Sequence, residues 1–173
     1  MKNEEIEIKL KYKNKLKIIS LLKNLGAKFK ERYELHDVYF SFHNTMSNDY
    51  ELIRIREIGK IKELTFKGKC EDNAHIWKRI EITTKIDDAE KMSSILLNLG
   101  LKKIKENISF REIYFLGSLE IAFINFVKPE KISLIELEGR EKQINFLLAK
   151  LKNLVEKAGE EIFKSFDKGQ NSS

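Results

Sequence analysis

The sequence predicts an α+β protein built on antiparallel strands that form a sheet or a barrel. Most of the chain alternates apolar and polar residues with the period of a strand. Only three stretches carry apolar residues at helical spacing. Eight glycines and one proline in 173 residues leave little room for a flexible linker, so short loops are expected between the elements.

The first strand is expected at residues 5–11, EIEIKLK, where three apolar residues alternate with four charged ones. A helix follows at residues 14–26, and Gly26 is expected to end it because glycine readily adopts the left-handed conformation of a helix C-terminus. The apolar stripe of this helix is expected to comprise Leu16, Ile19, Leu22 and Leu25.

Four strands are expected next, at residues 36–42, 51–57, 63–69 and 77–84. The second helix, residues 87–100, begins with Asp87 and has Glu90 three residues later, which is the spacing of a capping box. Further strands are expected at residues 109–115, 118–126 and 132–139. The third helix is expected at residues 140–159, with an apolar stripe of Ile144, Leu147, Leu148, Leu151, Leu154 and Val155.

Residues 21–40 and 96–115 resemble each other. Both contain a Leu-Gly pair at the end of a helix, a Lys-Glu pair, and then a Tyr-Phe pair, and both follow a strand at nearly the same offset. We interpret this as a duplicated half. Two such halves predict a pseudo-twofold sheet that closes on itself and so removes its edges.

The composition predicts a cytoplasmic protein without an internal disulfide. No apolar run approaches the length needed to cross a bilayer, the N-terminus has no signal-peptide core, and Cys70 is the only cysteine. The net charge of +6 favours an anionic partner such as a nucleotide or polyphosphate. Nucleic acid is less favoured, because lysine is spread along the whole chain and is not gathered into one basic arm.

Charged side chains share the polar faces of the strands at a spacing of two residues. These pairs are Glu5 and Glu7, Arg54 and Arg56, Arg79 and Glu81, and Glu136 and Glu138. A solvated outer face is the plain alternative. However, the planar fork of arginine matches two phosphate oxygens, and carboxylate oxygens are the ligands that Mg²⁺ prefers. The combination therefore indicates a site for a metal-bound polyphosphate.

These motifs carry a resemblance to a known family. The order EIEIK, HDVYF, LIRIR, LTFKGK, RIEIT, REIYF and LIELEG, from about Glu5 to Gly139, is similar to the CYTH family, the triphosphate tunnel metalloenzymes. Within it, the chain looks most like the class IV adenylate cyclases. The resemblance implies a closed, eight-stranded antiparallel β-barrel with flanking helices, whose tunnel is lined by the charged strand faces. It also implies one domain over residues 1–166, with a disordered tail at residues 167–173.

The resemblance assigns roles to single residues. The implied metal ligands for Mg²⁺ or Mn²⁺ are Glu5, Glu7, Glu81, Glu136 and Glu138. The implied triphosphate-binding residues are Lys9, Arg54, Arg56, Lys67, Arg79 and Arg111, of which Lys9 and Arg111 are also the catalytic candidates. Further candidates are Lys11, Asp37 and Asn125.

The implied activity is the conversion of ATP to 3′,5′-cyclic AMP and pyrophosphate, with a homodimer as the expected assembly. Two alternatives stay open: a thiamine or inorganic triphosphatase, and a non-catalytic binder of nucleotide or polyphosphate. Two departures from the family pattern motivate the last alternative. Ser109 stands where a lysine is usual, and Asn125 where an acidic residue is usual.

Overall fold

The computed structural model describes residues 4–73 and 76–158, which form ten strands and three helices. The strands are β1 (Glu4–Tyr12), β2 (Lys28–Ser41), β3 (Leu52–Ile58), β4 (Ile61–Lys67), β5 (Glu71–Asn73), β6 (Ile76–Lys85), β7 (Lys102–Leu116), β8 (Leu119–Lys128), β9 (Ile132–Glu138) and β10 (Val155–Lys157). The helices are α1 (Lys15–Asn24), α2 (Ala89–Asn98) and α3 (Glu141–Leu151).

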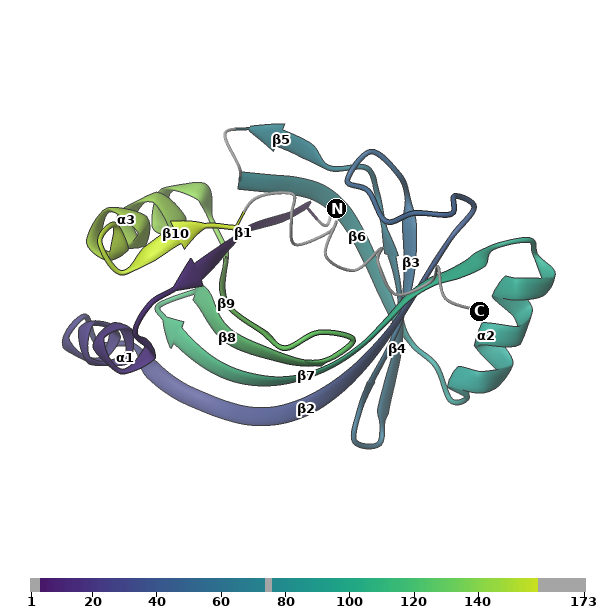
Figure 1. Cartoon of the computed structure of the whole chain (residues 1–173), viewed down its shortest axis with the longest axis horizontal. Helices are drawn as coiled ribbons and strands as arrows, with labels where there is room; N and C mark the ends of the chain where they lie inside the picture. The colour runs from purple at the N-terminus through teal and green to yellow at the C-terminus, as the bar shows by residue number, and fades with distance from the viewer. Residues whose placement is uncertain (1–3, 74–75, 159–173) are drawn as a thin grey trace.

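Eight of the strands close into an antiparallel barrel (Figure 1). Their order is β1-β9-β8-β7-β2-β3-β4-β6, and β6 pairs again with β1. Glu7 of β1 lies opposite Glu138 of β9 on one side and opposite Trp77 of β6 on the other. The predicted closed, eight-stranded fold is therefore confirmed, and the short strands β5 and β10 are additions to it.

The two halves of the barrel are related as the internal resemblance predicted. Exchanging β1, β2, β3 and β4 with β6, β7, β8 and β9 reproduces every strand pairing of the closed barrel. In each half, a strand is followed by a helix and then by a long strand, β2 or β7. Because β2 and β7 pair with each other along most of their length, the two halves meet along one continuous ladder.

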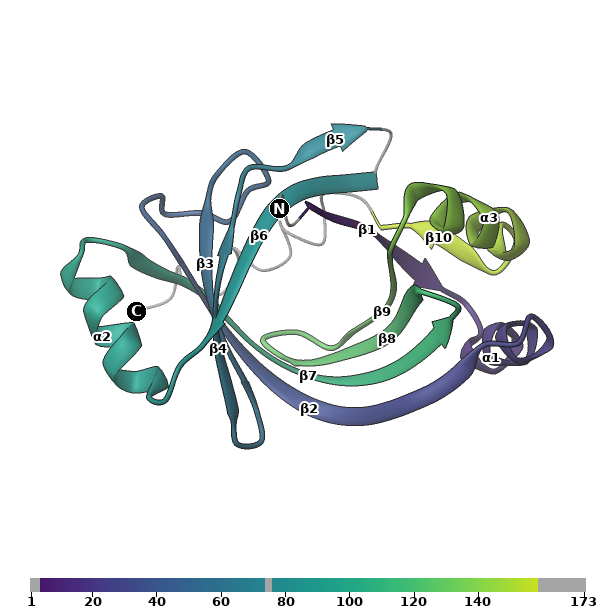
Figure 2. The ribbon, with the colours of Figure 1, turned by 180° about the vertical axis from the view of Figure 1, so that it is seen from behind.

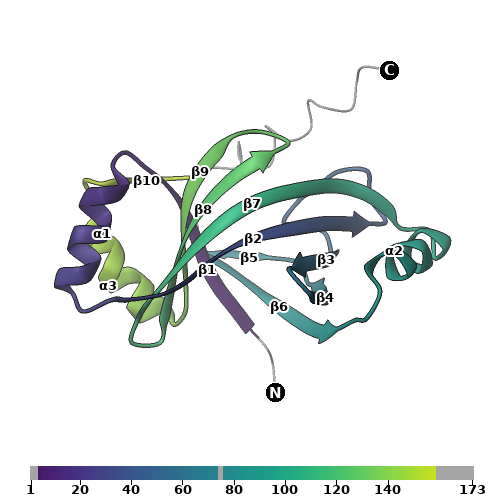
Figure 3. The ribbon, with the colours of Figure 1, turned by 90° about the horizontal axis from the view of Figure 1, so that it is seen from below.

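The main hydrophobic core lies outside the barrel, between its wall and two helices. Helices α1 and α3 lie side by side at one end of the molecule, and α2 lies at the other (Figures 2 and 3). Ile8 and Leu10 of β1, Phe123 of β8 and Leu137 of β9 face the first pair of helices and are at most 1% exposed. Because successive residues of a strand point to opposite faces, this packing turns the charged face of β1 to the inside.

Helix α2 covers the opposite wall. It packs Ala89 and Leu96 against Phe40 of β2, Ile55 of β3 and Leu101. These two clusters bury the outward apolar faces under helices, and the inside of the barrel holds the polar side chains together with a smaller apolar cluster of Ile113, Ala122 and Ile124.

The first two helices differ in detail from the sequence predictions, and strands β2 and β7 begin earlier than the predicted residues 36 and 109. In α1 the fully buried residues are Ile18 and Leu22, whereas Leu16, placed in the predicted stripe, is 78% exposed. Helix α2 is capped by Asp88, whose side chain accepts from the backbone N–H of Lys91, and not by Asp87. Because an α-helix has about 3.6 residues per turn, Leu16 lies on the side of α1 that faces away from the buried residues Ile18 and Leu22.

The third helix is shorter than predicted. It ends at Leu151, and residues 155–157 form β10, which pairs with Leu10, Lys11 and Tyr12 of β1. Strand β6 pairs with residues 4–7 of β1 only, so this later part of β1 would otherwise present an unpaired edge. Pairing of residues 155–157 with that edge therefore competes with extension of α3. The rest of the predicted helix and the predicted tail at residues 167–173 lie outside the described residues.

Replacing Leu22 with alanine should lower the free energy of unfolding by about 2–5 kcal/mol, because it opens a cavity between α1 and the barrel. The matched control, Leu16→Ala, should change it by less than about 0.5 kcal/mol because Leu16 is mostly exposed. Urea unfolding followed by circular dichroism measures both values. Equal losses of unfolding free energy in the two variants would contradict the structure, in which Leu22 and not Leu16 packs against the barrel.

Candidate functional site

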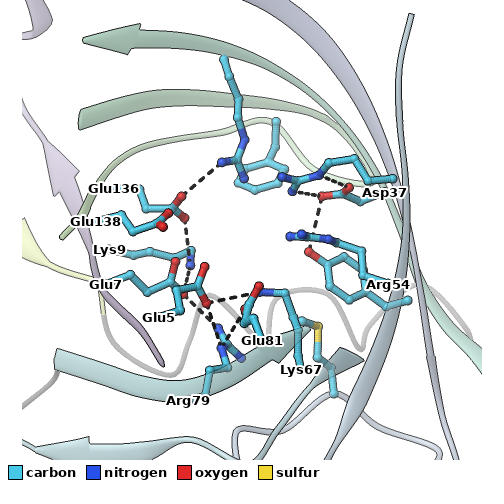
Figure 4. A pocket seen from close by; sticks show the side chains of 15 residues that line it. Glu5, Glu7, Lys9, Asp37, Arg54, Lys67, Arg79, Glu81, Glu136 and Glu138 are labelled. Atoms are coloured by element: carbon cyan, nitrogen blue, oxygen red, sulfur yellow. Dashed lines mark hydrogen bonds and ion pairs between the residues drawn. The ribbon is translucent and has the colours of Figure 1, made fainter. Parts of the chain in front are cut away.

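The barrel encloses a cavity of about 240 Å³ that is lined almost entirely by charged side chains (Figure 4). Its carboxylates are Glu5, Glu7, Asp37, Glu81, Glu136 and Glu138. Its cations are Lys9, Arg54, Arg56, Lys67, Arg79 and Arg111. Six negative groups therefore face six positive ones, and Tyr39, Met46 and Phe126 complete the lining.

The carboxylates of β1 and β9 gather on one wall of the cavity (Figure 4). Glu7 lies opposite Glu138, and Lys9 lies opposite Glu136, in the ladder between the two strands. The Nζ atom of Lys9 is 2.5 Å from Glu7 and 2.9 Å from Glu136, so it bridges two carboxylates. The same Nζ also lies 4.9 Å from the ring centroid of Trp77. Lys9 is thus held at the centre of the acidic wall.

A second group joins β1 to β4 and β6. Arg79 donates to Glu7 at 2.9 Å and to Glu5 at 3.3 Å, and it lies 3.3 Å from Glu81. Lys67 forms ion pairs with Glu81 and, at 3.5 Å, with Glu5. Because β6 pairs with β1 across the closure of the barrel, the contacts that reach Glu5 and Glu7 form only in the closed fold.

Arginines dominate the wall formed by β2, β3 and β7. Both Nε and Nη2 of Arg56 donate to the carboxylate of Asp37 at 2.7 Å, a bidentate pair that fixes the guanidinium plane. Arg111 of β7 donates to Glu136 at 3.1 Å, and only strand β8 separates β7 from β9. Asp37, a further candidate from the sequence, is an arginine partner in this structure.

Arg54 differs from the other cations of the cavity. It is 9% exposed and donates from Nη2 to the hydroxyl of Thr65 at 3.2 Å, and Thr65 is in turn bonded to Thr83. Within residues 4–73 and 76–158, its Nε atom has no hydrogen-bond partner, and no carboxylate lies within ion-pair distance of it. Burying a cation without an anion is costly, so this arrangement indicates a place for an anionic ligand.

The acidic groups of the cavity differ in their pKa values. Burial acts to raise the pKa of Glu7, but Lys9 and Arg79 outweigh it and leave this pKa well below its usual range. Burial and the nearby charge of Glu7 raise the pKa of Glu5 to about 9. Burial and the charge of Glu136 raise the pKa of Glu138 to about 7. The cations present therefore do not balance the negative charge at Glu5 and Glu138.

The donor set fits a hard divalent cation. No three histidine, cysteine, aspartate or glutamate side chains of the described residues converge closely enough to hold a metal ion, because the carboxylates are turned toward lysine and arginine. Even so, carboxylate oxygens are the donors that Mg²⁺ and Mn²⁺ prefer. The raised pKa values of Glu5 and Glu138 mark where added positive charge would be most favourable.

Most of the sequence-predicted site residues meet in this cavity, and two do not. Lys11 points to the same face as Lys9, but it lies beyond the cavity, is exposed, and is opposite Glu156 of β10. Asn125 lies on the outer face of β8, where its side chain accepts from Ser133 at 2.8 Å. The neighbours of Asn125, Ile124 and Phe126, are the residues that point inward. The prediction that Asn125 lies in the tunnel is therefore wrong, because Asn125 is on the opposite face of β8 from its inward-pointing neighbours.

Three lining residues were missed by the sequence analysis. Tyr39 and Phe126 follow the inward alternation of β2 and β8, so their positions could have been inferred once a neighbour was known to face inward. Met46 comes from the loop between β2 and β3, where no periodic pattern operates. Ser109 also faces inward and is fully buried.

Known proteins match the chain over most of its length. The CYTH domain matches residues 3–172. A "Putative adenylate cyclase" of Methanocaldococcus jannaschii is 32% identical over 160 residues, which cover 87% of this chain and 89% of that relative. No helix within the described residues has the length and apolar character needed to cross a membrane.

Two solved structures share the fold. A protein of Pyrococcus horikoshii has a TM-score of 0.73 at 24% identity, covering 92% of this chain and 98% of its own. A "Putative adenylyl cyclase" of Hippeastrum, described as having a dominant triphosphatase activity, has a TM-score of 0.67 at 20% identity. That match covers 93% of this chain and 95% of the Hippeastrum chain.

Replacing Glu138 with glutamine should stabilise the metal-free protein at neutral and higher pH only. Glu138 keeps its proton up to about pH 7 in the folded state, against 4.5 for an ordinary glutamate, so the folded state binds more protons in this range. Its contribution to stability is therefore complete below pH 4.5 and is lost as the pH rises through 7. Glutamine has no proton to lose.

Thermal unfolding in EDTA at several pH values measures this effect. The Tm difference between Glu138→Gln and the natural protein should be near zero at about pH 4 and positive at about pH 8. Glu130→Gln, at an exposed carboxylate, is the matched control. A difference that is the same at both pH values would show that burial does not raise the pKa of Glu138.

Proposed function

The chain belongs to the CYTH domain family, and on this basis we propose that it is a metal-dependent enzyme that binds a triphosphate in the barrel cavity. As the specific activity we propose that of a class IV-type adenylate cyclase, which forms 3′,5′-cyclic AMP and pyrophosphate from ATP. The name of the Methanocaldococcus relative supports this activity, since it is 32% identical over most of both chains.

The observation that carries the proposal is the buried arginine on β3. Arg54 has no carboxylate partner within the described residues, and it faces the same cavity as Arg56, Lys67 and Arg111. A polyphosphate carries several negative charges in a chain, so it would meet all four cations at once. Bidentate contacts from arginine to phosphate oxygens are among the strongest polar contacts available in proteins.

Glu5, Glu7, Glu81, Glu136 and Glu138 are the residues proposed to hold the metal. A bound Mg²⁺ or Mn²⁺ would lower the pKa of an oxygen bound to it and neutralise phosphate charge. The carboxylates come from β1, β6 and β9, which are neighbours in the closed barrel. The proposed phosphate ligand Arg54 lies across the cavity on β3 (Figure 4), whereas Lys9 and Arg79 stand among the carboxylates.

Lys9 and Arg111 are proposed to stabilise the charge that develops during the reaction. In the cyclase reaction, the ribose 3′-oxygen forms a bond to the α-phosphorus while the bond to the β-phosphate bridge breaks, and pyrophosphate leaves. The proton of the 3′-hydroxyl passes to water. Both Lys9 and Arg111 contact Glu136 in the structure, so when Glu136 holds the metal, both cations are available to the phosphates.

A triphosphatase is the second candidate. It is favoured by the Hippeastrum structure, which shares the fold and is described as having a dominant triphosphatase activity. The same side chains would then direct water to the terminal phosphorus. A non-catalytic binder is less well supported, because the cavity holds all six proposed phosphate cations and all five proposed metal carboxylates. The homodimer and the cytoplasmic location remain predictions.

Incubation of the purified protein with ATP and Mn²⁺, followed by separation of the products, decides between these functions. Equal amounts of cyclic AMP and pyrophosphate are expected for the cyclase. Orthophosphate without cyclic AMP would instead establish the triphosphatase. Thiamine triphosphate and tripolyphosphate should be assayed in parallel, and tight binding of all three without any product would leave only the non-catalytic role.

Replacing Arg54 with methionine should lower kcat/KM for the triphosphate by roughly 10- to 100-fold, since charge-assisted hydrogen bonds contribute about 1.5–3 kcal/mol. The Tm should not fall, because the variant removes a buried cation that has no carboxylate within ion-pair distance in the described residues. Arg140→Met, at an exposed arginine just before α3, is the matched control and should leave kcat/KM unchanged. Equal activity of the two variants would remove Arg54 from the phosphate site.

A further inference from the structure

Trp77 is the only tryptophan of the chain, and it lies on the inner face of β6. It stands two residues before Arg79, whose side chain lines the cavity, and opposite Glu7 of β1. Its neighbour Ile76 points outward and packs into the core beneath α1 and α3, whereas within the described residues Trp77 belongs to none of the clusters of buried apolar side chains. Trp77 is 6% exposed, so a large ring is enclosed on a charged strand face.

The ring of Trp77 contacts one of the proposed catalytic cations. The Nζ atom of Lys9 lies 4.9 Å from the centroid of the ring, which is within the range of a cation–π interaction. Tryptophan forms the strongest such interactions among the aromatic side chains. Lys9 lines the cavity, whereas Trp77 is not among the described residues that line it. Trp77 would therefore act on a ligand in the cavity through Lys9 and not by direct contact.

The ammonium of Lys9 is held by groups of two kinds. Glu7 and Glu136 attract it by charge, at 2.5 Å and 2.9 Å, and the Trp77 ring attracts it by its electron-rich face. The two carboxylates are also proposed metal ligands. A carboxylate that binds a divalent cation attracts the ammonium less strongly, because the positive charge of the metal repels it. The indole is no ligand for such a metal, so it keeps its own attraction for Lys9 when metal is bound.

This difference matters because the side chain of lysine is long and flexible. Its rotamer entropy opposes any single position of the ammonium, so Lys9 needs a lasting contact if it is to stay at the cavity. Trp77 can supply that contact, because its ring is buried and is therefore itself held in place. Lys9 is on β1 and Trp77 is on β6, so closure of the barrel brings the ammonium and the ring together.

We propose that Trp77 is a positioning residue, which holds the ammonium of Lys9 at the cavity when Glu7 and Glu136 bind the metal. This inference rests on the proposed triphosphate function and adds a residue to it. Two consequences can be measured separately. The ring should stay in contact with Lys9 after metal binding, and loss of the ring should lower the rate of the reaction.

Tryptophan fluorescence measures the first consequence without turnover, because Trp77 is the only tryptophan of the chain. A positive charge beside an indole shifts its emission, so Lys9→Met should differ from the natural protein in emission maximum in EDTA. The difference should persist in saturating Mg²⁺, because Lys9 keeps its place over the ring. Lys9→Gln is a second neutral variant in case Lys9→Met does not fold. Lys13→Met, at an exposed lysine just after β1, is the matched control and should leave the emission unchanged.

Turnover measures the second consequence, with Mn²⁺ and whichever of ATP, thiamine triphosphate and tripolyphosphate the natural protein converts. Trp77→Leu should lower kcat by roughly 3- to 30-fold and change KM less than about twofold, because Lys9 is proposed to act on charge that develops in the reaction. Trp77→Phe keeps an aromatic face and should recover part of this loss, although both variants remove ring volume and lower the Tm. Phe146→Leu, at an exposed ring of α3, is the matched control and should leave kcat unchanged.

An emission difference that disappears in Mg²⁺ would overturn the inference, since Lys9 would then leave the ring when metal binds. No emission difference in EDTA would also overturn it, because the contact would not exist. Equal losses of kcat in Trp77→Leu and Trp77→Phe, or no loss in either, would reduce Trp77 to a packing role. All of these outcomes leave the triphosphate function standing. If the natural protein converts none of the three triphosphates, the proposed enzymatic function fails, and the role of Trp77 fails with it.

Discussion

The structure depends on the mutual neutralisation of the charges that the barrel encloses. Six carboxylates and six cations line one cavity, and most of them contact a partner of opposite sign. Enclosing any one of these groups alone would cost several kcal/mol. Pairing makes the enclosure tolerable, and the apolar residues of the same strands are thereby turned outward. Helices α1, α2 and α3 are then required, because they cover the outer faces on which Ile8, Phe123 and Ile55 lie.

The same pairing explains how one cavity can serve two ligands of opposite charge. Lys9 and Arg79 contact the carboxylates proposed for the metal, while Lys67 contacts Glu81 in the same way. In the proposed function these contacts are exchanged: cations turn to phosphate, and carboxylates turn to metal. The protein thus holds its binding groups in place by pairing them with each other. Arg54 departs from this pattern, and for that reason it is the most informative side chain of the cavity.

Strand faces could be predicted from the sequence, and so could most of the cavity. Alternation alone groups Glu5, Glu7 and Lys9 on one face, and it does the same for Arg54 and Arg56. Whether that face points into the barrel or out of it depends on closure of the barrel, which alternation does not encode. The inward direction was predicted from the family resemblance. The misplacement of Asn125 shows the limit, since a slip of one position reverses the face.

Features that depend on distant partners could not be predicted. The bidentate contact between Arg56 and Asp37 requires β2 and β3 to be in register, and the end of α3 is decided by a free edge on β1. Met46 reaches the cavity from a loop, where no period applies. In each case the decisive neighbour is far away in the chain or outside any repeating element.

The closure of the barrel by β1 also has a consequence for the order of events during synthesis. Strand β1 leaves the ribosome before the other strands of the barrel, yet it pairs with β9, the last strand of the ring, and with β6. Contacts between such distant segments carry a large loop-closure entropy and form late in folding. Glu5, Glu7 and Lys9 all lie on β1, so a nascent chain that has not yet released β9 has no assembled cavity. The binding groups come together only when nearly the whole domain has emerged. Incomplete chains therefore lack the binding cavity.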